Sequence, residues 1–151
     1  MKPFPICIGL LFLAVGCTSC SGDFSEAKEA LGQSRRGTIT GQATLISELR
    51  ATGASVEIVG EVDQPFLSVT GTMFKVQGED VQVFEYSSAA ELEAQAGLIS
   101  RDGTTVGTTK IHWIGSPHFF KQERALVLYV GDDRNVLKSL EAVLGRQFAG
   151  Q

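Results

Sequence analysis

Basic residues are too few in this chain of 151 residues to suit a protein that binds nucleic acid. The 13 Lys and Arg residues stand against 17 Asp and Glu residues, which gives a formal net charge of −4. Nucleic-acid-binding proteins carry a surplus of basic residues gathered in patches, so we expect no nucleic-acid partner. Proline is also scarce, with 4 residues, while 43% of the residues are hydrophobic. That balance argues against a long disordered chain.

Familiar catalytic and metal-binding motifs are missing as well. The sequence contains no HExxH, no P-loop and no Gly-x-Ser-x-Gly nucleophile elbow. Its two histidines, His112 and His118, match no compact metal-ligand spacing. We therefore expect no metal, no cofactor and a non-enzymatic role. One alternative stays open, an envelope hydrolase or metal-dependent enzyme in which both histidines converge with a carboxylate such as Glu123 or Asp102.

No apolar run in the sequence is long enough to cross a membrane. A transmembrane helix needs about 20 consecutive apolar residues, and the run over residues 6–15 is roughly half that length. It follows Lys2 and precedes small residues, which is typical of a secretory signal peptide. The sequence therefore predicts an exported chain.

The end of this leader carries a more specific pattern. Residues 13–17 read Leu-Ala-Val-Gly-Cys, which resembles the lipobox of bacterial lipoproteins. The resemblance implies cleavage before Cys17 and lipid on its sulfur, and several acyl chains would hold the protein firmly to a membrane. Ala14 departs from the family, which prefers Leu there, and an ordinary secretory peptide with a free thiol is the alternative. Thr18 occupies the position where Asp retains lipoproteins in the inner membrane of enteric bacteria, so we expect the outer membrane where the cell has one.

Three segments result from this interpretation. Residues 1–16 form the signal peptide, and residues 17–40, which are polar, small and broken by glycines, form a flexible lipid-anchored tether. Residues 41–150 have the length of one domain.

Within the domain, helical periodicity and capping signals predict three helices, and alternating or wholly apolar runs predict five strands. The helices are expected over residues 42–52, from a capping box at residues 88–91, and from Asp132 or Asp133 to Gly145; the strands are expected over residues 56–62, 72–76, 81–86, 110–115 and 124–130. The fold class is therefore α+β, in the order α-β-β-β-α-β-β-α with a weak internal ββα repeat. Because hairpins make antiparallel neighbours, we expect an antiparallel sheet of about five strands with helices packed on one face.

Two apolar loops are the candidate contact surfaces. Phe119 and Phe120 follow a turn predicted at residues 116–117, and adjacent side chains on a strand point to opposite faces. One ring is therefore exposed for a partner, or the loop folds back and buries both. Phe66 lies in a second apolar loop. The leading hypothesis is an extracytoplasmic, lipid-anchored module that binds an envelope protein or peptide through these rings or through the sheet face without helices.

Overall fold

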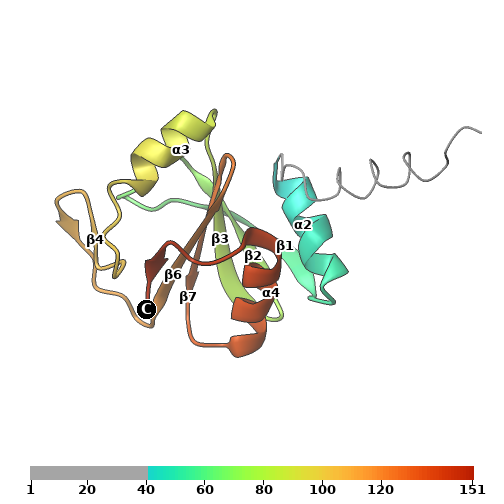
Figure 1. The fold of residues 1–151 in the computed structure, drawn as a ribbon. Helices are drawn as coiled ribbons and strands as arrows, with labels where there is room; N and C mark the ends of the chain where they lie inside the picture. Colours follow the sequence, from blue (N-terminus) through green and yellow to red (C-terminus); the bar gives the residue numbers. More distant parts are fainter. Residues whose placement is uncertain (1–40) are drawn as a thin grey trace, which may run out of the picture. The chain divides into compact units, whose positions relative to one another are not determined.

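A six-stranded antiparallel sheet forms the centre of residues 41–151, the part of the chain that the computed structural model describes (Figure 1). The predicted signal peptide (residues 1–16), Cys17 and the remainder of the predicted tether (residues 17–40) lie outside the described residues. The elements follow in the order α2 (Gln42–Ala51), β1 (Val56–Val62), β2 (Gly71–Val76), β3 (Glu79–Glu85), α3 (Ala89–Ala96), β4 (Thr105–Val106), β5 (Thr109–Lys110), β6 (Pro117–Gln122), β7 (Ala125–Val130), α4 (Arg134–Leu144) and β8 (Ala149–Gly150). The α+β class with an antiparallel sheet is confirmed.

The strands of the main sheet lie in the order β1-β2-β3-β7-β6-β8, and β4 pairs with β5 in a separate small sheet. β7 lies between β3 and β6, where Val127 pairs with Val83 on one side and with Phe120 on the other. Its first five residues are buried. This explains why β7 is apolar at every position, as expected for a central strand covered on both faces.

Helices cover both faces of the sheet, which corrects the expectation that they pack on one face. Leu45 and Leu49 of α2 and Leu140 of α4 join one core cluster, whereas Leu92 of α3 joins the cluster on the opposite face (Figure 1). The face that α3 covers is the second face of the sheet, and the segments 63–70 and 98–113 cover the rest of it. The sequence-based argument placed all three helices on one face and left the other face to loops, the tether or a partner, although the wholly apolar run over residues 125–130 indicates a strand that is covered on both faces.

Side-chain caps begin two of the helices where the sequence predicted. Ser88 caps α3 by accepting a hydrogen bond from the Glu91 amide, and Asp133 caps α4 by accepting from the amides of Asn135 and Val136. Each side chain satisfies amides that have no partner inside the first turn of the helix. The β2-β3-α3 and β6-β7-α4 segments therefore repeat the order ββα, but their helices lie on opposite faces of the sheet.

The hairpin of β6 and β7 has its turn at a different position from the one that the sequence predicted. β6 and β7 join through a two-residue turn at Glu123 and Arg124, with Gln122 pairing with Ala125, whereas the sequence predicted the turn at residues 116–117. Glu123 adopts a positive φ of 53°, a conformation that few residues other than glycine adopt. The sequence therefore gives no local signal for a turn at this position. The strand predicted over residues 110–115 is wrong, because within that range only Lys110, the second residue of β5, belongs to a strand.

Candidate functional site

A groove of about 610 Å³ lies on the second face of the sheet, between β2–β3 and the segment 111–114. Met73 and Lys75 of β2 and Gln82 of β3 point to this face, since Met73 pairs with Gln82 and side chains alternate along each strand. The lining residues are Gln64, Phe66, Met73, Lys75, Gly78, Glu79, Asp80, Gln82, Ile111, His112, Trp113, Ile114 and Val130. Its volume is within the range of pockets that bind small molecules.

One wall of the groove is aromatic and firmly held. The Trp113 ring meets the Phe66 ring edge-on at 5.7 Å and the Phe119 ring at 5.9 Å between centroids. Its indole N–H donates to the carbonyl oxygen of Gly103 at 2.7 Å. These contacts position the segment 111–114 above the sheet and leave the side chain of Ile114, the next residue, fully exposed. A large apolar side chain without neighbours at the edge of a groove is the kind of feature that marks a contact surface.

Polar groups lie along the floor of the groove. The Gln64 side-chain amide donates to the Gln82 side-chain oxygen at 2.8 Å, and Lys75 pairs with Asp80 at 2.8 Å. Both members of the ion pair are well exposed, so the pair contributes little to stability. The floor therefore offers hydrogen-bonding groups and charges beside an apolar wall.

The three aromatic rings predicted to contact a partner have different positions. Phe66 is half-buried and lines the groove, so it remains a candidate contact residue. Phe119 and Phe120 are both 0% exposed, which is a correction: they point to opposite faces of β6, and each face is covered by its own core. The alternative that both rings are buried is correct. The reason is that both faces of β6 are covered, and no loop folds back over the rings.

The two histidines do not converge. His112 is exposed and lines the groove. His118 is buried on the opposite face of the sheet, where its ring stacks on Tyr129 at 5.9 Å and its Nδ1 lies 2.6 Å from the Gln147 side-chain oxygen. The enzyme alternative that uses both imidazoles at one centre therefore has no geometric basis.

The carboxylates named with these histidines are placed elsewhere. Glu123 lies in the β6–β7 turn, and Asp102 accepts hydrogen bonds from the hydroxyls of Ser100 and Thr104. These bonds, that from Ser100 first, lower the pKa of the Asp102 carboxyl below its usual value. Within residues 41–151, no group of three or more His, Cys, Asp and Glu side chains is arranged to hold a metal ion.

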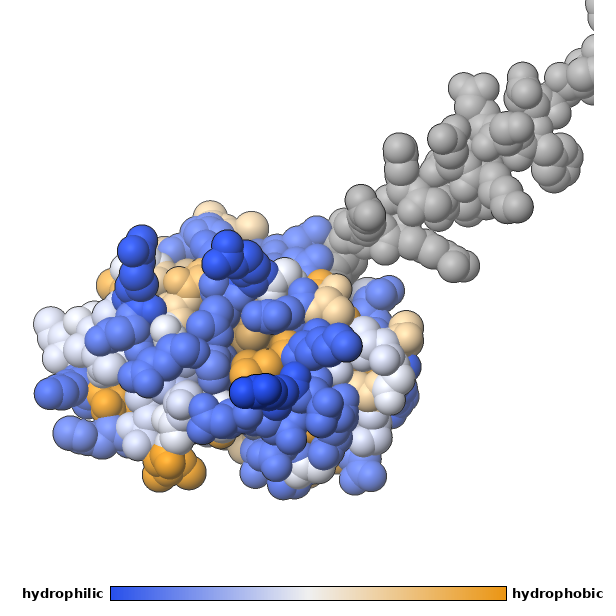
Figure 2. All heavy atoms as spheres, turned by 60° about the horizontal axis from the view of Figure 1, so that its bottom comes forward, coloured by the Kyte–Doolittle hydropathy of each residue, from blue (hydrophilic) through white to orange (hydrophobic). Residues whose placement is uncertain are grey.

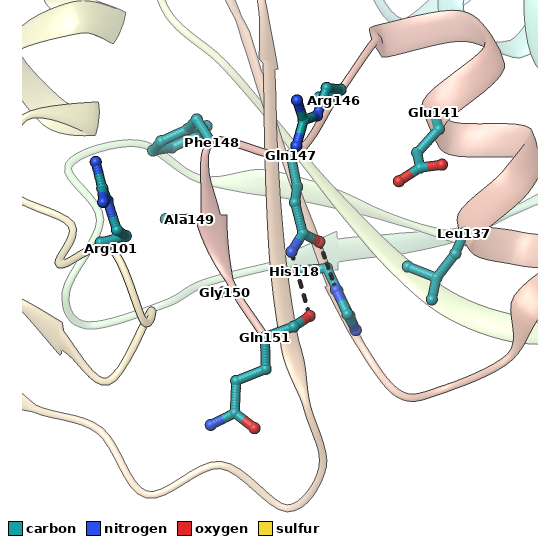
Figure 3. Close-up of a pocket in the computed structure, with 10 residues that line it drawn as sticks. All are labelled: Arg101, His118, Leu137, Glu141, Arg146, Gln147, Phe148, Ala149, Gly150 and Gln151. Carbon is teal, nitrogen blue, oxygen red and sulfur yellow. Dashed lines mark hydrogen bonds between the residues drawn. The ribbon is translucent and has the colours of Figure 1, made fainter.

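A second pocket, of about 580 Å³, lies beside β8 and α4 and includes His118 (Figure 3). Gln147 occupies its centre, bonded to His118 and donating to the Gln151 carbonyl oxygen at 3.2 Å. Arg101 and Arg146 lie on either side of Phe148 and do not point to a common place (Figure 3). The pocket thus lacks convergent groups for one ligand, and the groove is the better candidate site.

Most groove residues were missed by the sequence analysis. Trp113 and Ile114 were assigned to a strand, where alternation would have buried one of them. Lys75, Asp80 and Gln82 share one face of the predicted first hairpin, and this polar face was a signal that part of the sheet stays in contact with water.

Comparison of the chain with protein-family models, with curated proteins and with solved structures finds no match. Among the helices described, none combines the length and the apolar character needed to cross a membrane.

Proposed function

We propose that this chain is a lipid-anchored binding module of the bacterial cell envelope, without enzymatic activity, that contacts an envelope protein or peptide through the groove. The observation that carries the proposal is the combination of a preformed aromatic wall, a floor of polar groups and the fully exposed side chain of Ile114 in one place. Interaction surfaces of proteins likewise combine apolar contacts with hydrogen-bonding groups.

The distribution of exposed apolar residues supports this choice. Hydrophilic residues dominate the face drawn in Figure 2, and apolar atoms emerge there only as separate patches. The exposed large apolar residues of the described chain are Ile58 and Val59 on β1, Leu98 after α3, and Ile114. Of these four, only Ile114 lines the groove, so apolar exposure and a concave surface coincide at this residue.

Anchoring through Cys17 rests on the lipobox resemblance of residues 13–17. A Cys17→Ser variant, expressed in the cells that produce the chain, should leave the membrane fraction and lose incorporated lipid. Retention of this variant in the membrane fraction at the wild-type level would contradict the anchor.

The binding role is tested by photo-cross-linking in intact cells. Benzoylphenylalanine at position 114 should give a discrete cross-linked product, because an exposed side chain at a contact surface is close to the partner. The matched control carries the same group at position 48, on the exposed side of α2 and away from the groove. Equal products at both positions, or none at position 114, would refute the groove as the contact surface.

A further inference from the structure

We propose that two copies of the chain associate edge to edge through β1, in antiparallel orientation about a two-fold axis at Ile58, so that their sheets become continuous. This inference goes beyond the proposed function and does not depend on it, because no residue of β1 lines the groove. Three features carry it: an edge strand with outward backbone groups, an exposed apolar centre, and opposite charges at the two ends of the strand.

β1 is an edge strand of the main sheet and lies beside α2 (Figure 1). The Ser55 carbonyl oxygen accepts a hydrogen bond from the Gln77 amide, on the side of β2, at 2.9 Å. Because backbone groups of alternate residues point to the same side of a strand, those of Val56 and Ile58 point outwards. Arg50 of α2 accordingly donates to the outward carbonyl oxygen of Val56 at 2.8 Å. Within residues 41–151 no hydrogen bond engages the outward groups of Ile58, so a second strand can pair there.

The middle of this edge is apolar. Ile58 is 63% exposed and Val59 is 59% exposed, which makes them two of the four exposed large apolar residues of the described chain. Ile58 pairs with Phe74, a core residue on the face that α2 covers, so the Ile58 side chain lies on that face. In the proposed pair the two Ile58 side chains are directly opposite each other on one face. Each therefore removes apolar surface of the other from water.

Opposite charges lie at the two ends of the edge, on the same face as Ile58. The Arg50 guanidinium is held at the first residue of β1. Glu61, near the other end, pairs with Thr72, whose hydroxyl accepts a hydrogen bond from Gln42 of α2. Arg50 and Glu61 are both exposed, and neither belongs to an ion pair in the part of the chain that the structure describes. The edge is thus complementary to a second copy that runs in the opposite direction.

A bulge in β1 makes the two ends equidistant from the centre. Val59 is its extra residue, because the pairing with β2 omits this position. Glu61, three residues after Ile58, is therefore about as far along the strand from Ile58 as Val56, two residues before it. In an antiparallel pair centred on Ile58, the Glu61 carboxylate of each copy consequently lies next to the Arg50 guanidinium of the other. The interface contains two equivalent ion pairs around an apolar centre.

Glu57 is the other carboxylate of β1, and it does not oppose this arrangement strongly. It pairs with Lys75 of β2, so its side chain lies on the opposite face from Ile58. In the proposed pair the two Glu57 residues are diagonal neighbours, about 7–8 Å apart. Exposed charges at such a separation repel each other only weakly in water.

Charge reversal tests the ion pairs, with self-association of the full chain in detergent measured by sedimentation equilibrium. The unaltered chain should show a reversible monomer–dimer equilibrium. Arg50→Glu and Glu61→Arg should each weaken it at least about tenfold, because two attractive contacts become repulsive. A mixture of the two variants should restore association, since their reversed charges are complementary. The matched control, Glu48→Arg, lies about 200° away from Arg50 around α2 and should have no effect.

Cross-linking tests the register in the membrane fraction of cells that produce the chain. In a Cys20→Ser background, which removes the second cysteine of the predicted tether, Ile58→Cys should give a covalent dimer with a short bismaleimide. Directly opposite residues of an antiparallel pair have their Cα atoms about 4.5–5.5 Å apart. Glu61→Cys is the control on the same strand and should give little product, because its two copies are more than about 10 Å apart along the strand direction.

An uncharged variant keeps the test valid where a charge reversal disturbs folding, which circular dichroism detects. Ile58→Ser should weaken association at least about tenfold, as loss of a central apolar contact does, while Leu98→Ser, at an exposed apolar residue outside β1, should not. A chain that stays monomeric up to its solubility limit overturns the proposal. Association that ignores these variants, a mixture that does not restore it, or equal cross-linking at positions 58 and 61 overturns it as well.

Discussion

The opposite orientations of Phe119 and Phe120 lead to a quantitative prediction about the two cores. Both rings are fully buried, but their surroundings differ. The Phe119 ring has edge or tilted contacts with Trp113 at 5.9 Å and with Phe148 at 6.3 Å. Among the aromatic pairs of residues 41–151, none includes Phe120.

We therefore expect unequal costs for the same substitution at the two positions. Leucine retains most of the apolar volume of phenylalanine, so Phe120→Leu should lower the free energy of unfolding by less than about 1.5 kcal/mol. Phe119→Leu loses two aromatic pairs in addition, each worth about 0.5–1.5 kcal/mol beyond buried area. The variant at position 119 should thus be less stable than the variant at position 120 by about 1–3 kcal/mol.

Equilibrium denaturation in urea, followed by circular dichroism, measures both values. The chain has 1 tryptophan, and it contacts Phe119 and lies in the core opposite Phe120. Native fluorescence should therefore change in Phe119→Leu and remain close to wild type in Phe120→Leu. Equal losses of stability at the two positions, or a Trp113 spectrum that responds only to position 120, would refute the two-core arrangement.

Further predictions concern α4 and the tyrosines. Asp133→Ala removes the side chain that accepts from two amides and should lower the urea-measured stability by about 1–2 kcal/mol, whereas Asp132→Ala should have little effect. Gly131→Ala places a methyl group 2.5 Å from the Tyr129 hydroxyl, which must then release the Asp133 amide that donates to it at 3.0 Å; we expect a loss of about 1–3 kcal/mol. Burial raises the pKa of both Tyr86 and Tyr129 above 10.0. The folded chain therefore holds these protons more tightly than the unfolded chain, so this contribution to stability is complete below pH 10.0 and is lost as the pH rises through the raised values. Ultraviolet titration should show both phenols ionising late, and a phenol that ionises at its ordinary value would contradict its burial.

Much of the fold was predictable because local signals and tertiary packing agree there. The helix at α4 combines an acidic cap, an apolar stripe and Gly145 at its end, where φ is 79°, and each of these signals is visible in the sequence. Likewise, the turn between β2 and β3 contains Gly78, whose φ of 91° few other residues adopt. The strands on either side of it were predicted to within two residues.

The errors arose where a local signal was ambiguous and tertiary contacts decided. Ser116 and Pro117 resemble a turn, but Pro117 begins β6, a position in which a strand tolerates proline. The true turn at Glu123 and Arg124 contains neither glycine nor proline. Adjacent apolar residues such as Phe119 and Phe120 indicate burial on both faces, and that interpretation depends on whether the second face is covered, which no local pattern shows.

Helix α3 and the loop of residues 63–70, which cover part of the second face of the sheet, also explain why the groove exists. Leu92, Gln95 and Ala96 of α3 are buried, and the Gln95 amide donates to the Phe66 carbonyl oxygen at 3.4 Å, which holds the loop of residues 63–70 against this helix. Leu126 and Leu128 of β7 lie beneath that cover.

Beyond the cover, Lys75 and Gln82 occupy the same face of β2 and β3, and polar side chains there cost little because water reaches them. The segment 111–114 closes one side through Trp113, and Met73 is the one apolar side chain among the β2 and β3 residues that line the groove. The groove therefore remains open in the free protein because the polar residues on its floor prevent collapse, and the same residues give it the hydrogen bonds and the charge by which a partner would be recognised.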